Sequence, residues 1–599
     1  MPKLALLIRG TALLLCLLIF QAASTSHGQA SVSGACIGSE RDALLSFKAS
    51  LLDPAGRLSS WQGEDCCQWK GVRCSNRTGH LIKLNLRNID RDTMYNMGYY
   101  MHDNSYYMSD SYPNRSRSLS LSAGEMSPSL ATLQHLRYLD LSYNDFNGTS
   151  IPVFLTSLKN LRYLNLSSAG FGGRIPSQLG NLSKLQYLDV GQNYHYYYGN
   201  MPYTVDLAWV SGLSLLRHID MSIVDLSSGG DWFQRVNMLP SLKVLRLFHC
   251  GLNSTMSASI SLSNLTHLEV LDMSDNTFHA SLKHAWFWNL TGLKELHLRY
   301  SRLEGSIPTD LANMASLQVI DFSGNDLVGL APKNSENLCN LRIMRFNSNN
   351  IGSSLGGFME RLPKCSWNTL QELSLTHLEL LDMSDNTFQT SLKHAWFWNL
   401  TGLKELHLRD SGWEGSIPSD LANMTSLQVI DFSWNDLMGL IPKKLENLCN
   451  LTRMVFTSNN IGSSIGEFME RLPKCSWNTL QEFSVQEANM TGKLLIWIGN
   501  MTNLSVLQAS KNMLTGPLPV GVGALSNLKR LDSSYNNFSG VLLKEQFAGL
   551  EKLDELDINH NNFNGVLLKE QFASLGNLKH LDLSYNKFIG VLFNEHLQV

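Results

Sequence analysis

Two short patterns in this chain have the residue types of a hydrolase site. The sequences GSSLG at residues 352–356 and GSSIG at residues 462–466 fit the G-x-S-x-G pattern that presents a nucleophilic serine. Such a serine needs a buried strand before it, a helix after it, and His and Asp partners. Both copies instead fall at a turn within a repeated unit, so we expect no serine hydrolase.

A pair of carboxylates, Asp189 and Asp220, is the next catalytic candidate. On adjacent strands about 4.8 Å apart, the two groups could resemble the acid pair of a retaining glycosidase. The same strand position, however, holds Asp in many parts of the chain, and a repeated, solvated row is not a site. We therefore predict no catalytic residue. Zinc-ligand spacing and phosphate loops are also missing, so we expect no metal and no cofactor.

The element that would position these side chains is a repeat, L-x-x-L-x-L-x-x-N. It starts, for example, at Leu136, Leu161 and Leu185, and most steps are 24 or 25 residues. A fixed period of this length indicates leucine-rich repeats. Leucines two residues apart face one side of a short strand, and stacked coils bury them together. We predict an α/β solenoid: a right-handed leucine-rich repeat superhelix with a parallel β-sheet on its concave face and an N-terminal disulfide cap.

The last position of the pattern and the segment after it have structural explanations. The closing Asn is expected to hydrogen-bond the backbone of neighbouring coils, which would otherwise hold unpaired buried groups. Cys250 replaces this Asn in one coil, and we interpret it as a buried free thiol. After the strand, G-x-I/L-P sequences such as the one at Gly305 predict a turn and a short helical return.

The chain divides into three predicted parts. Residues 1–30 are a signal peptide, since basic residues precede an apolar run that is too short to cross a membrane. Residues 31–80 form the cap, an amphipathic helix followed by DCCQWKGVRC. Residues 81–599 hold about 19 repeats, with a Tyr-rich insert at 88–118. This insert, with a second Tyr-rich stretch at 192–204, is either a mobile loop or an aromatic contact surface.

An internal duplication interrupts the repeat phase. Residues 266–373 recur almost unchanged as 376–483, at a constant offset of 110. At the seam, the strand pattern of Leu370–Leu375 is followed by another at Leu378 after only eight residues. Parallel neighbours need a longer crossover. We therefore predict that only one of Leu370–Leu375 and Leu378–Asp385 joins the sheet.

The cysteines suggest disulfides in an exported protein. Four lie in the cap and allow three pairings, of which the one joining adjacent residues is disfavoured; they are Cys36, Cys66, Cys67 and Cys74. Two further pairs each precede consecutive strand patterns, and we predict a bridge in each: Cys339 with Cys365, and Cys449 with Cys475.

N-glycosylation acceptors are dense, as expected of a surface glycoprotein. They are Asn76, Asn114, Asn147, Asn165, Asn181, Asn253, Asn264, Asn289, Asn399, Asn423, Asn450, Asn489, Asn500, Asn503 and Asn537. Several lie four residues before a strand's first Leu, so stacking should gather their glycans on one flank. Asn165 is different because it lies within a strand pattern and points to the concave face.

The form of the repeat indicates a family. G-x-I-P repeats behind CCQWKGVRC resemble those of plant extracellular leucine-rich repeat proteins. SPSLATLQHLRYLDLSYNDFNG and DLAWVSGLSLLRHIDMS narrow the resemblance to plant receptor-like proteins of the Cf type, over essentially the whole mature chain. The resemblance implies the cap pairing Cys36–Cys66 and Cys67–Cys74. It also implies a kinase-less cell-surface receptor, active in defence or developmental signalling through a receptor kinase co-receptor or adaptor.

The sequence stops before the membrane helix expected of such receptors. We expect a location on the extracellular side of the plasma membrane if the chain is truncated, and secretion to the apoplast if it ends at Val599. The alternative is a secreted inhibitor similar to plant polygalacturonase-inhibiting proteins, which have fewer repeats.

The concave face is the usual binding face of a solenoid. Arg and aromatic residues are favoured as binding anchors. They lie together on one predicted strand and again two strands further on; the candidate ligand-binding residues are Arg246, Phe248, His249, His297, Arg299 and Tyr300. The ligand would be a peptide, a glycan or a protein. The net charge of −3 and the lack of a long basic run argue against nucleic acid.

Overall fold

The computed structural model of the chain describes residues 36–88, 120–123, 125–193, 201–230, 232–253, 264–330, 338–351, 378–443 and 445–592. Contacts divide the chain into two compact units, Met1–Leu242 and Lys243–Val599. The signal peptide, nearly all of the Tyr-rich insert and residues 352–377 lie outside the described residues.

The first unit begins with the cap. Helix α2 (Gly38–Ala49) buries Leu44 and Phe47 completely. Next come the 3-10 helix η1 (Cys66–Gln68) and strand β1 (Val72–Cys74), which pairs antiparallel with β2 (Leu81–Asn85). The cap is therefore a helix and a short hairpin laid over the first coil.

Two disulfides hold the cap elements together. Cys36–Cys66 joins the start of the helix to η1, and Cys67–Cys74 joins η1 to β1. This is the pairing that the family resemblance implied.

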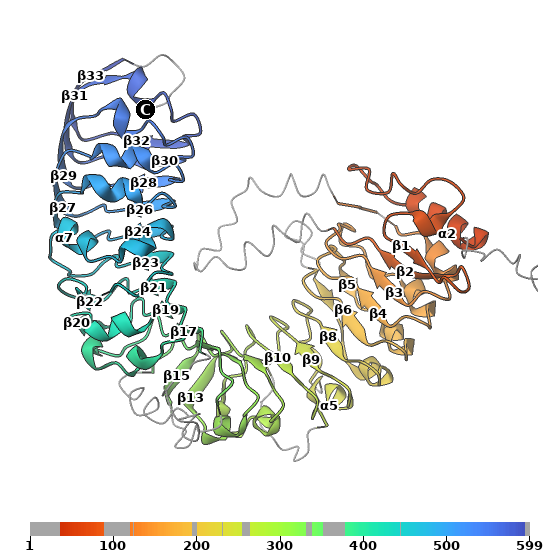
Figure 1. The fold of residues 1–599 in the computed structure, drawn as a ribbon. Helices are drawn as coiled ribbons and strands as arrows, with labels where there is room; N and C mark the ends of the chain where they lie inside the picture. Colours follow the sequence, from red (N-terminus) through yellow and green to blue (C-terminus); the bar gives the residue numbers. More distant parts are fainter. Residues whose placement is uncertain are drawn as a thin grey trace, which may run out of the picture. The chain divides into compact units, whose positions relative to one another are not determined.

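Short parallel strands, one per coil, form the core ladder of the first unit (Figure 1). They are β2, β3 (Tyr138–Asp140), β4 (Tyr163–Asn165), β6 (Tyr187–Asp189) and β8 (His218–Asp220). In each strand one aliphatic residue is in register with that of the next strand and is fully buried, as Leu84, Leu139 and Leu164 are. The period-two spacing of the leucines thus becomes a continuous apolar column.

The second unit continues with the same architecture. Its ladder strands pair in parallel, each with the next: β9 (Val244–Arg246), β10 (Val270–Asp272), β12 (Glu295–His297), β14 (Val319–Asp321), β16 (Ile343–Arg345), β17 (Leu380–Asp382), β19 (Glu405–His407), β21 (Val429–Asp431), β23 (Arg453–Val455), β24 (Glu482–Ser484), β26 (Val506–Gln508), β28 (Arg530–Asp532), β30 (Glu555–Asp557) and β32 (His580–Asp582). The first and third residues of each strand, with the turn that follows, form what we call the ladder face.

The repeated Asn links each coil to the one before it, as predicted. Asn276 is typical: its Nδ2 donates to the carbonyl oxygens of Leu247 and Met273, and its Oδ1 accepts from the backbone N–H groups of Cys250 and Leu252. Buried backbone groups that leave the ladder are thereby satisfied. Cys250 is buried and outside any disulfide, as expected.

Most coils return through a short helix in the described part of the chain. These are η2 (Pro128–Thr132), η3 (Val153–Ser157), η4 (Ser177–Asn181), η5 (Ala208–Gly212), η6 (Leu282–His284), η7 (Trp286–Asn289), η8 (Thr309–Asn313), η9 (Leu392–His394), η10 (Trp396–Asn399), η11 (Ser419–Asn423), η12 (Lys474–Asn478), η13 (Ile496–Asn500), η14 (Val520–Ala524), η15 (Lys544–Gln546) and η16 (Lys569–Phe572), with α5 (Trp232–Val236) and α7 (Ile465–Glu470) in two coils. Pro308 precedes η8, and Gly305 before it has a φ of 82°, a conformation that suits glycine.

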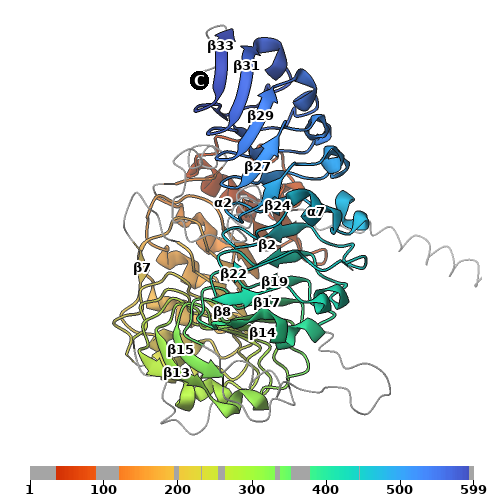
Figure 2. The same ribbon diagram turned by 90° about the vertical axis from the view of Figure 1, so that its left-hand side faces the viewer.

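Between the ladder and these helices run small parallel sheets, which Figure 2 shows as a second row of strands. They comprise β5 (Gly173–Arg174) with β7 (Pro202–Tyr203); β11 (Ala280–Ser281), β13 (Leu303–Ile307) and β15 (Asp326–Leu330); β18 (Thr390–Ser391), β20 (Trp413–Gly415) and β22 (Asp436–Leu437); and β25 (Thr491–Gly492), β27 (Met513–Gly516), β29 (Asn537–Val541), β31 (Asn562–Leu568) and β33 (Lys587–Leu592).

At the seam, β17 pairs with β16 on one side and with β19 on the other. The Leu378 segment therefore occupies the ladder position directly after Ile343–Arg345. No position remains between β16 and β17 for a further strand. Leu370–Leu375 lies outside the described residues.

The predicted bridge Cys449–Cys475 is present and ties two neighbouring coils. Its counterpart in the first copy has one described member, Cys339, which is disulfide-bonded. Cys365 lies outside the described residues.

Candidate functional site

The six candidate ligand-binding residues come from two coils of the second unit. Arg246 closes β9 and His297 closes β12, with β10 between them in register. The sequence analysis placed Phe248, His249, Arg299 and Tyr300 on the same strands, and this is wrong. Each strand ends after three residues, and these four residues occupy the turns that follow.

The turn has a regular backbone feature. His249 and Tyr300 have positive φ values of 51° and 49°, which bend the chain out of the ladder. The same conformation recurs in each coil from that of β3 onward, at the residue before the ladder Asn or its replacement. We call these turn-ridge residues; in the second unit they are His249, Asp275, Tyr300, Gly324, Ser348, Asp385, Asp410, Trp434, Ser458, Glu487, Lys511, Tyr535, His560 and Tyr585.

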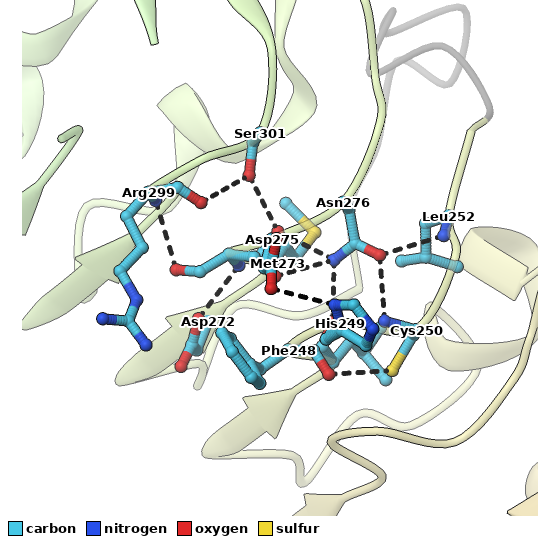
Figure 3. Close-up of polar contacts among 12 residues, drawn as sticks. Phe248, His249, Cys250, Leu252, Asp272, Met273, Asp275, Asn276, Arg299 and Ser301 are labelled. Carbon is cyan, nitrogen blue, oxygen red and sulfur yellow. Dashed lines mark hydrogen bonds and ion pairs between the residues drawn. The ribbon is translucent and has the colours of Figure 1, made fainter. Parts of the chain in front are cut away.

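The structure brings Phe248 and Arg299 together across the intervening coil. The Arg299 guanidinium carbon lies 5.2 Å from the centre of the Phe248 ring, a cation–π contact. Between them lies Ser274, a small buried side chain whose Oγ accepts from the Arg299 backbone N–H at 3.2 Å. Figure 3 shows Arg299 and Phe248 on either side of the Asp272–Met273 segment.

His249 has a different partner. Its Nδ1 lies 2.9 Å from an Asp275 carboxylate oxygen, one coil further on (Figure 3). This hydrogen bond, together with the negative charge of Asp275, raises the pKa of His249 against the opposing effect of burial. The pair presents a partly exposed imidazole held in one orientation.

His297 interacts within its own strand. Its Nε2 lies 3.5 Å from a Glu295 carboxylate oxygen. This hydrogen bond and the charges of His297 and Arg246 lower the pKa of Glu295, although burial of the carboxylate acts in the opposite direction.

Tyr300, the sixth candidate, lies over Gly324 in the next coil. A Cβ added to Gly324 would stand 2.2 Å from the Tyr300 ring. The site thus consists of three local arrangements, not one cluster.

Sequence reasoning missed the pattern that connects these residues. The third strand position alternates between basic or His residues and Asp over eight coils in register: Arg246, Asp272, His297, Asp321, Arg345, Asp382, His407 and Asp431. Arg or His side chains thus alternate with carboxylates at about the 4.8 Å strand spacing, which separates the Asp residues from one another and is electrostatically favourable. Arg345 and His407 could have been found from their place in the repeat pattern.

The Asp residues of this row have a structural role. Asp321 Oδ1 accepts the backbone N–H of Ser323 at 3.2 Å, and Asp431 Oδ1 accepts that of Ser433 at 3.1 Å. In the first unit, Asp189 and Asp220 are directly paired on neighbouring strands, as expected. Their carboxylates likewise accept backbone N–H groups two residues on, at 3.1 and 2.9 Å. Their hydrogen bonds fix turns, and this arrangement suits recognition better than acid–base chemistry.

One of the two hydrolase candidates, GSSLG, lies outside the described residues. In GSSIG, Ser464 directly precedes α7, but the ladder strand before it, β23, already ends at Val455. The strand that should lead directly into a nucleophile turn is therefore missing at Ser464. In the described part of the chain, one cluster has metal-ligand geometry, Cys36, Cys66 and Cys67. All three cysteines are in disulfides.

Five of the predicted glycosylation sites occupy the same flank of their coils. Asn181, Asn289, Asn399, Asn423 and Asn500 are each the last residue of a 3-10 helix, and all are exposed. A hollow of about 480 Å³ at this flank is lined by both Asn399 and Asn423, so glycans there would cover it. In each coil the ladder face lies on a different side from the flank that carries these asparagines.

Asn165 does not fit the glycosylation prediction. It is only 3% exposed, and its amide lies 3.4 Å from the Tyr163 hydroxyl while its Oδ1 accepts from Ser167. A glycan has no room there in the folded chain, so the structure argues against this site. Asn114 lies outside the described residues.

Comparisons with known proteins agree with this fold. The leucine rich repeat N-terminal domain matches residues 37–75. Leucine rich repeat families match residues 132–151, 160–182, 266–327, 426–448 and 577–597.

Similar curated proteins are plant receptor-like proteins. Receptor-like protein EIX1 of Solanum lycopersicum is 35% identical over 308 residues, 50% of this chain and 27% of that protein. Receptor-like protein EIX2 of the same plant is 29% identical over 294 residues, 48% of this chain and 26% of that protein. The matched part of the chain thus spans about a quarter of the length of these relatives.

Similar solved structures are plant leucine-rich repeat ectodomains. One is the ectodomain of the receptor kinase GASSHO1/SCHENGEN3 from Arabidopsis thaliana in complex with CASPARIAN STRIP INTEGRITY FACTOR 2, with a TM-score of 0.58 and 25% identity over 92% of this chain and 65% of that one. Another is the plant peptide hormone receptor RGFR1 in complex with RGF2, with a TM-score of 0.54 and 23% identity over 87% and 84%. No helix among the described residues is both long and apolar enough to cross a membrane.

Proposed function

We propose that this leucine-rich repeat protein, a relative of plant receptor-like proteins, is the extracellular ligand-recognition region of a cell-surface receptor. It binds a polypeptide ligand on the ladder face between β9 and β12. The contact between Phe248 and Arg299 carries the proposal, because an aromatic ring and a cation are held together there with both side chains partly exposed.

The chemistry of the face favours a polypeptide ligand. Phe248 and Arg299 offer an apolar edge next to a positive charge, while His249 and Asp275 offer a polar pair on the turn ridge. A chain that carries both apolar and charged side chains can use all of these groups. Aromatic and Arg residues are also the commonest energetic anchors of interfaces.

The similar proteins support the receptor assignment. The curated relatives are receptor-like proteins, and the GASSHO1/SCHENGEN3 ectodomain is a ligand-bound part of a membrane receptor kinase. By analogy, the chain acts outside the plasma membrane without enzymatic activity of its own. Signalling would then pass through a partner receptor kinase.

Ligand capture tests the proposal. The secreted chain is immobilised, incubated with the extracellular peptide fraction of plant tissue, and the retained peptides are identified by mass spectrometry. A specific peptide should be retained by the wild-type chain and by Lys283→Ala, a variant at an exposed position of the returning helix η6. Its affinity should fall about tenfold or more in the double variant Phe248→Ala/Arg299→Ala. Equal retention by all three proteins, or no selective retention, would contradict the proposal.

A further inference from the structure

Trp434 is an unusual turn-ridge residue. Its φ of 57° is that of the other ridge residues, and its side chain is 52% exposed. Within the described part of the chain, no ring or cation contacts the indole. The protein thus presents a large, half-exposed aromatic side chain that no other described ring or cation covers.

The duplicated copy shows that this residue is part of a two-residue exchange. Where the second copy has Asp410 and Trp434, the first copy has Tyr300 and Gly324. Tyr300 covers Gly324 so closely that a Cβ there would lie 2.2 Å from the ring. A side chain at the second position therefore requires a smaller one at the first, and the second copy meets this requirement with Asp.

Asp410 lies next to Trp434 on the ridge. The Asp410 backbone N–H donates to the carbonyl oxygen of Ser433 at 2.9 Å, which places the two ridge residues in adjacent coils. Asp410 is exposed and has a positive φ of 46°. A residue with a carboxylate and a residue with an exposed indole thus occupy neighbouring ridge positions.

The surrounding charges are mainly acidic. Asp385 precedes Asp410 on the ridge, and burial raises the pKa of Asp385 while its hydrogen bond to Ser348 and the charge of Arg409 oppose the rise. Arg409, the residue before Asp410, is the neighbouring cation. On the other side, Ser458 is uncharged and Glu487 lies 3.6 Å from Lys511. The indole and the Asp410 carboxylate together offer what a cation needs, a π face and a negative charge.

We propose that Trp434 and Asp410 form a subsite for a cationic side chain, Lys or Arg, of a polypeptide partner. The cation lies over the indole and pairs with the Asp410 carboxylate. The two corresponding positions of the first copy, Tyr300 and Gly324, supply no carboxylate. The inference rests on the proposed function only in that a polypeptide carries the cation, and the subsite is separate from Phe248 and Arg299.

Fluorine NMR on the secreted chain labelled with 5-fluorotryptophan tests the subsite. The Trp434 resonance, one of 13 tryptophans, is assigned with Trp434→Phe. The chain is then titrated with acetyl-(Gly-Lys)₄-amide, the matching Glu peptide and the matching norleucine peptide. The Lys peptide should shift this resonance saturably, and the other two peptides should leave it unchanged. Asp410→Asn should weaken binding of the Lys peptide at least threefold.

The exchange itself provides the control for folding. The variant Asp410→Tyr/Trp434→Gly installs the pair that the first copy already accommodates, and it should bind the Lys peptide at least threefold more weakly by calorimetry. Phe248→Ala/Arg299→Ala should leave the titration unchanged, so failure of the proposed function and failure of this subsite are separable. An equal response to the norleucine peptide, no response to the Lys peptide, or an unchanged affinity in Asp410→Asn would overturn the inference.

Discussion

The two copies of the duplicated segment, 266–373 and 376–483, have the same framework and different surfaces. β12 and β19 are identical in sequence, and so is the ELHLR segment that contains each of them. In the coil of β16 and β23, three residues of the ladder face differ while the buried ones between them do not: Ile343, Arg345 and Asn347 correspond to Arg453, Val455 and Thr457. In this coil the buried positions are retained, and the differences lie on the face that a partner would contact.

One difference lies in the core instead. Leu303, on β13, is fully buried, and its counterpart Trp413, on β20, is 3% exposed. The Trp413 ring lies 4.9 Å from the Phe388 ring and 5.7 Å from the Phe397 ring. The second copy thus accepts a larger residue at a position that the first fills with Leu, and the two copies need not have equal stability.

The largest expected effect follows from this core position. Trp413→Ala should lower the free energy of unfolding by about 3–5 kcal/mol, because it leaves a large cavity. Trp413→Leu should cost less, since Leu fills the same place in the first copy and removes an indole N–H that is buried without a partner among the described residues. Urea unfolding followed by circular dichroism measures both. Equal losses for Ala and Leu would show that the copies pack this position differently.

The disulfide between coils comes next. Cys449→Ser should lower the free energy of unfolding by about 2–4 kcal/mol, because the unfolded chain loses a cross-link over 26 residues. Thermal unfolding under non-reducing conditions measures the loss. Cys475→Ser is the matched control and should behave alike. If reduction of the wild-type chain leaves its unfolding unchanged, the bridge does not stabilise the second copy.

The exchanged ridge pair gives a smaller, coupled effect. Gly324→Trp in the first copy should cost about 1–3 kcal/mol, because the new side chain must displace the Tyr300 ring. Adding Tyr300→Asp, which recreates the pair of the second copy, should recover most of that loss. A double-mutant cycle on urea unfolding measures the coupling, which should exceed about 0.5 kcal/mol. Additive costs would mean that the two positions diverged independently.

The smallest expected effect concerns pH. Burial alone would lower the pKa of His407, but its hydrogen bond to Glu405 and the charges of Asp382, Asp431 and Glu405 leave that pKa above the usual value. Because the pKa of His407 is higher in the folded than in the unfolded chain, the protonated imidazole stabilises the fold. This contribution is fully present below the pKa of the unfolded chain, which is about 6.5. That contribution is lost as pH rises through the folded-state pKa.

His407→Gln should therefore be less stable than the wild-type chain at pH 5.5, and the difference should shrink above pH 8. Urea unfolding at both values measures it. His297→Gln is the matched variant in the first copy, where the imidazole is 24% exposed against 9% for His407. If the difference in unfolding free energy between the wild-type chain and His407→Gln grows with pH, the fold is stabilised by the neutral and not by the protonated imidazole.

Much of the fold could be predicted from the sequence, because each feature depends on short-range spacing. Leucines at period two define the strands, Asn144 and its equivalents close each coil, and four cysteines with their family resemblance define the cap. The sequon positions before each strand also predicted the common flank of Asn181 and Asn289. The sequence pattern is easy to recognise because it recurs in successive units of the chain.

Only the tertiary structure decided how side chains from different coils meet. Phe248 and Arg299 touch because Ser274 between them is small and buried, which depends on the register of three coils. Asn165 looks like any other sequon, but packing against Tyr163 buries it. Tyr300 and Gly324 are far apart in sequence, and only their stacking shows that each residue restricts the other. The repeat pattern determines which face a residue lies on, whereas its contacts depend on the neighbouring coils that the backbone places about 4.8 Å away.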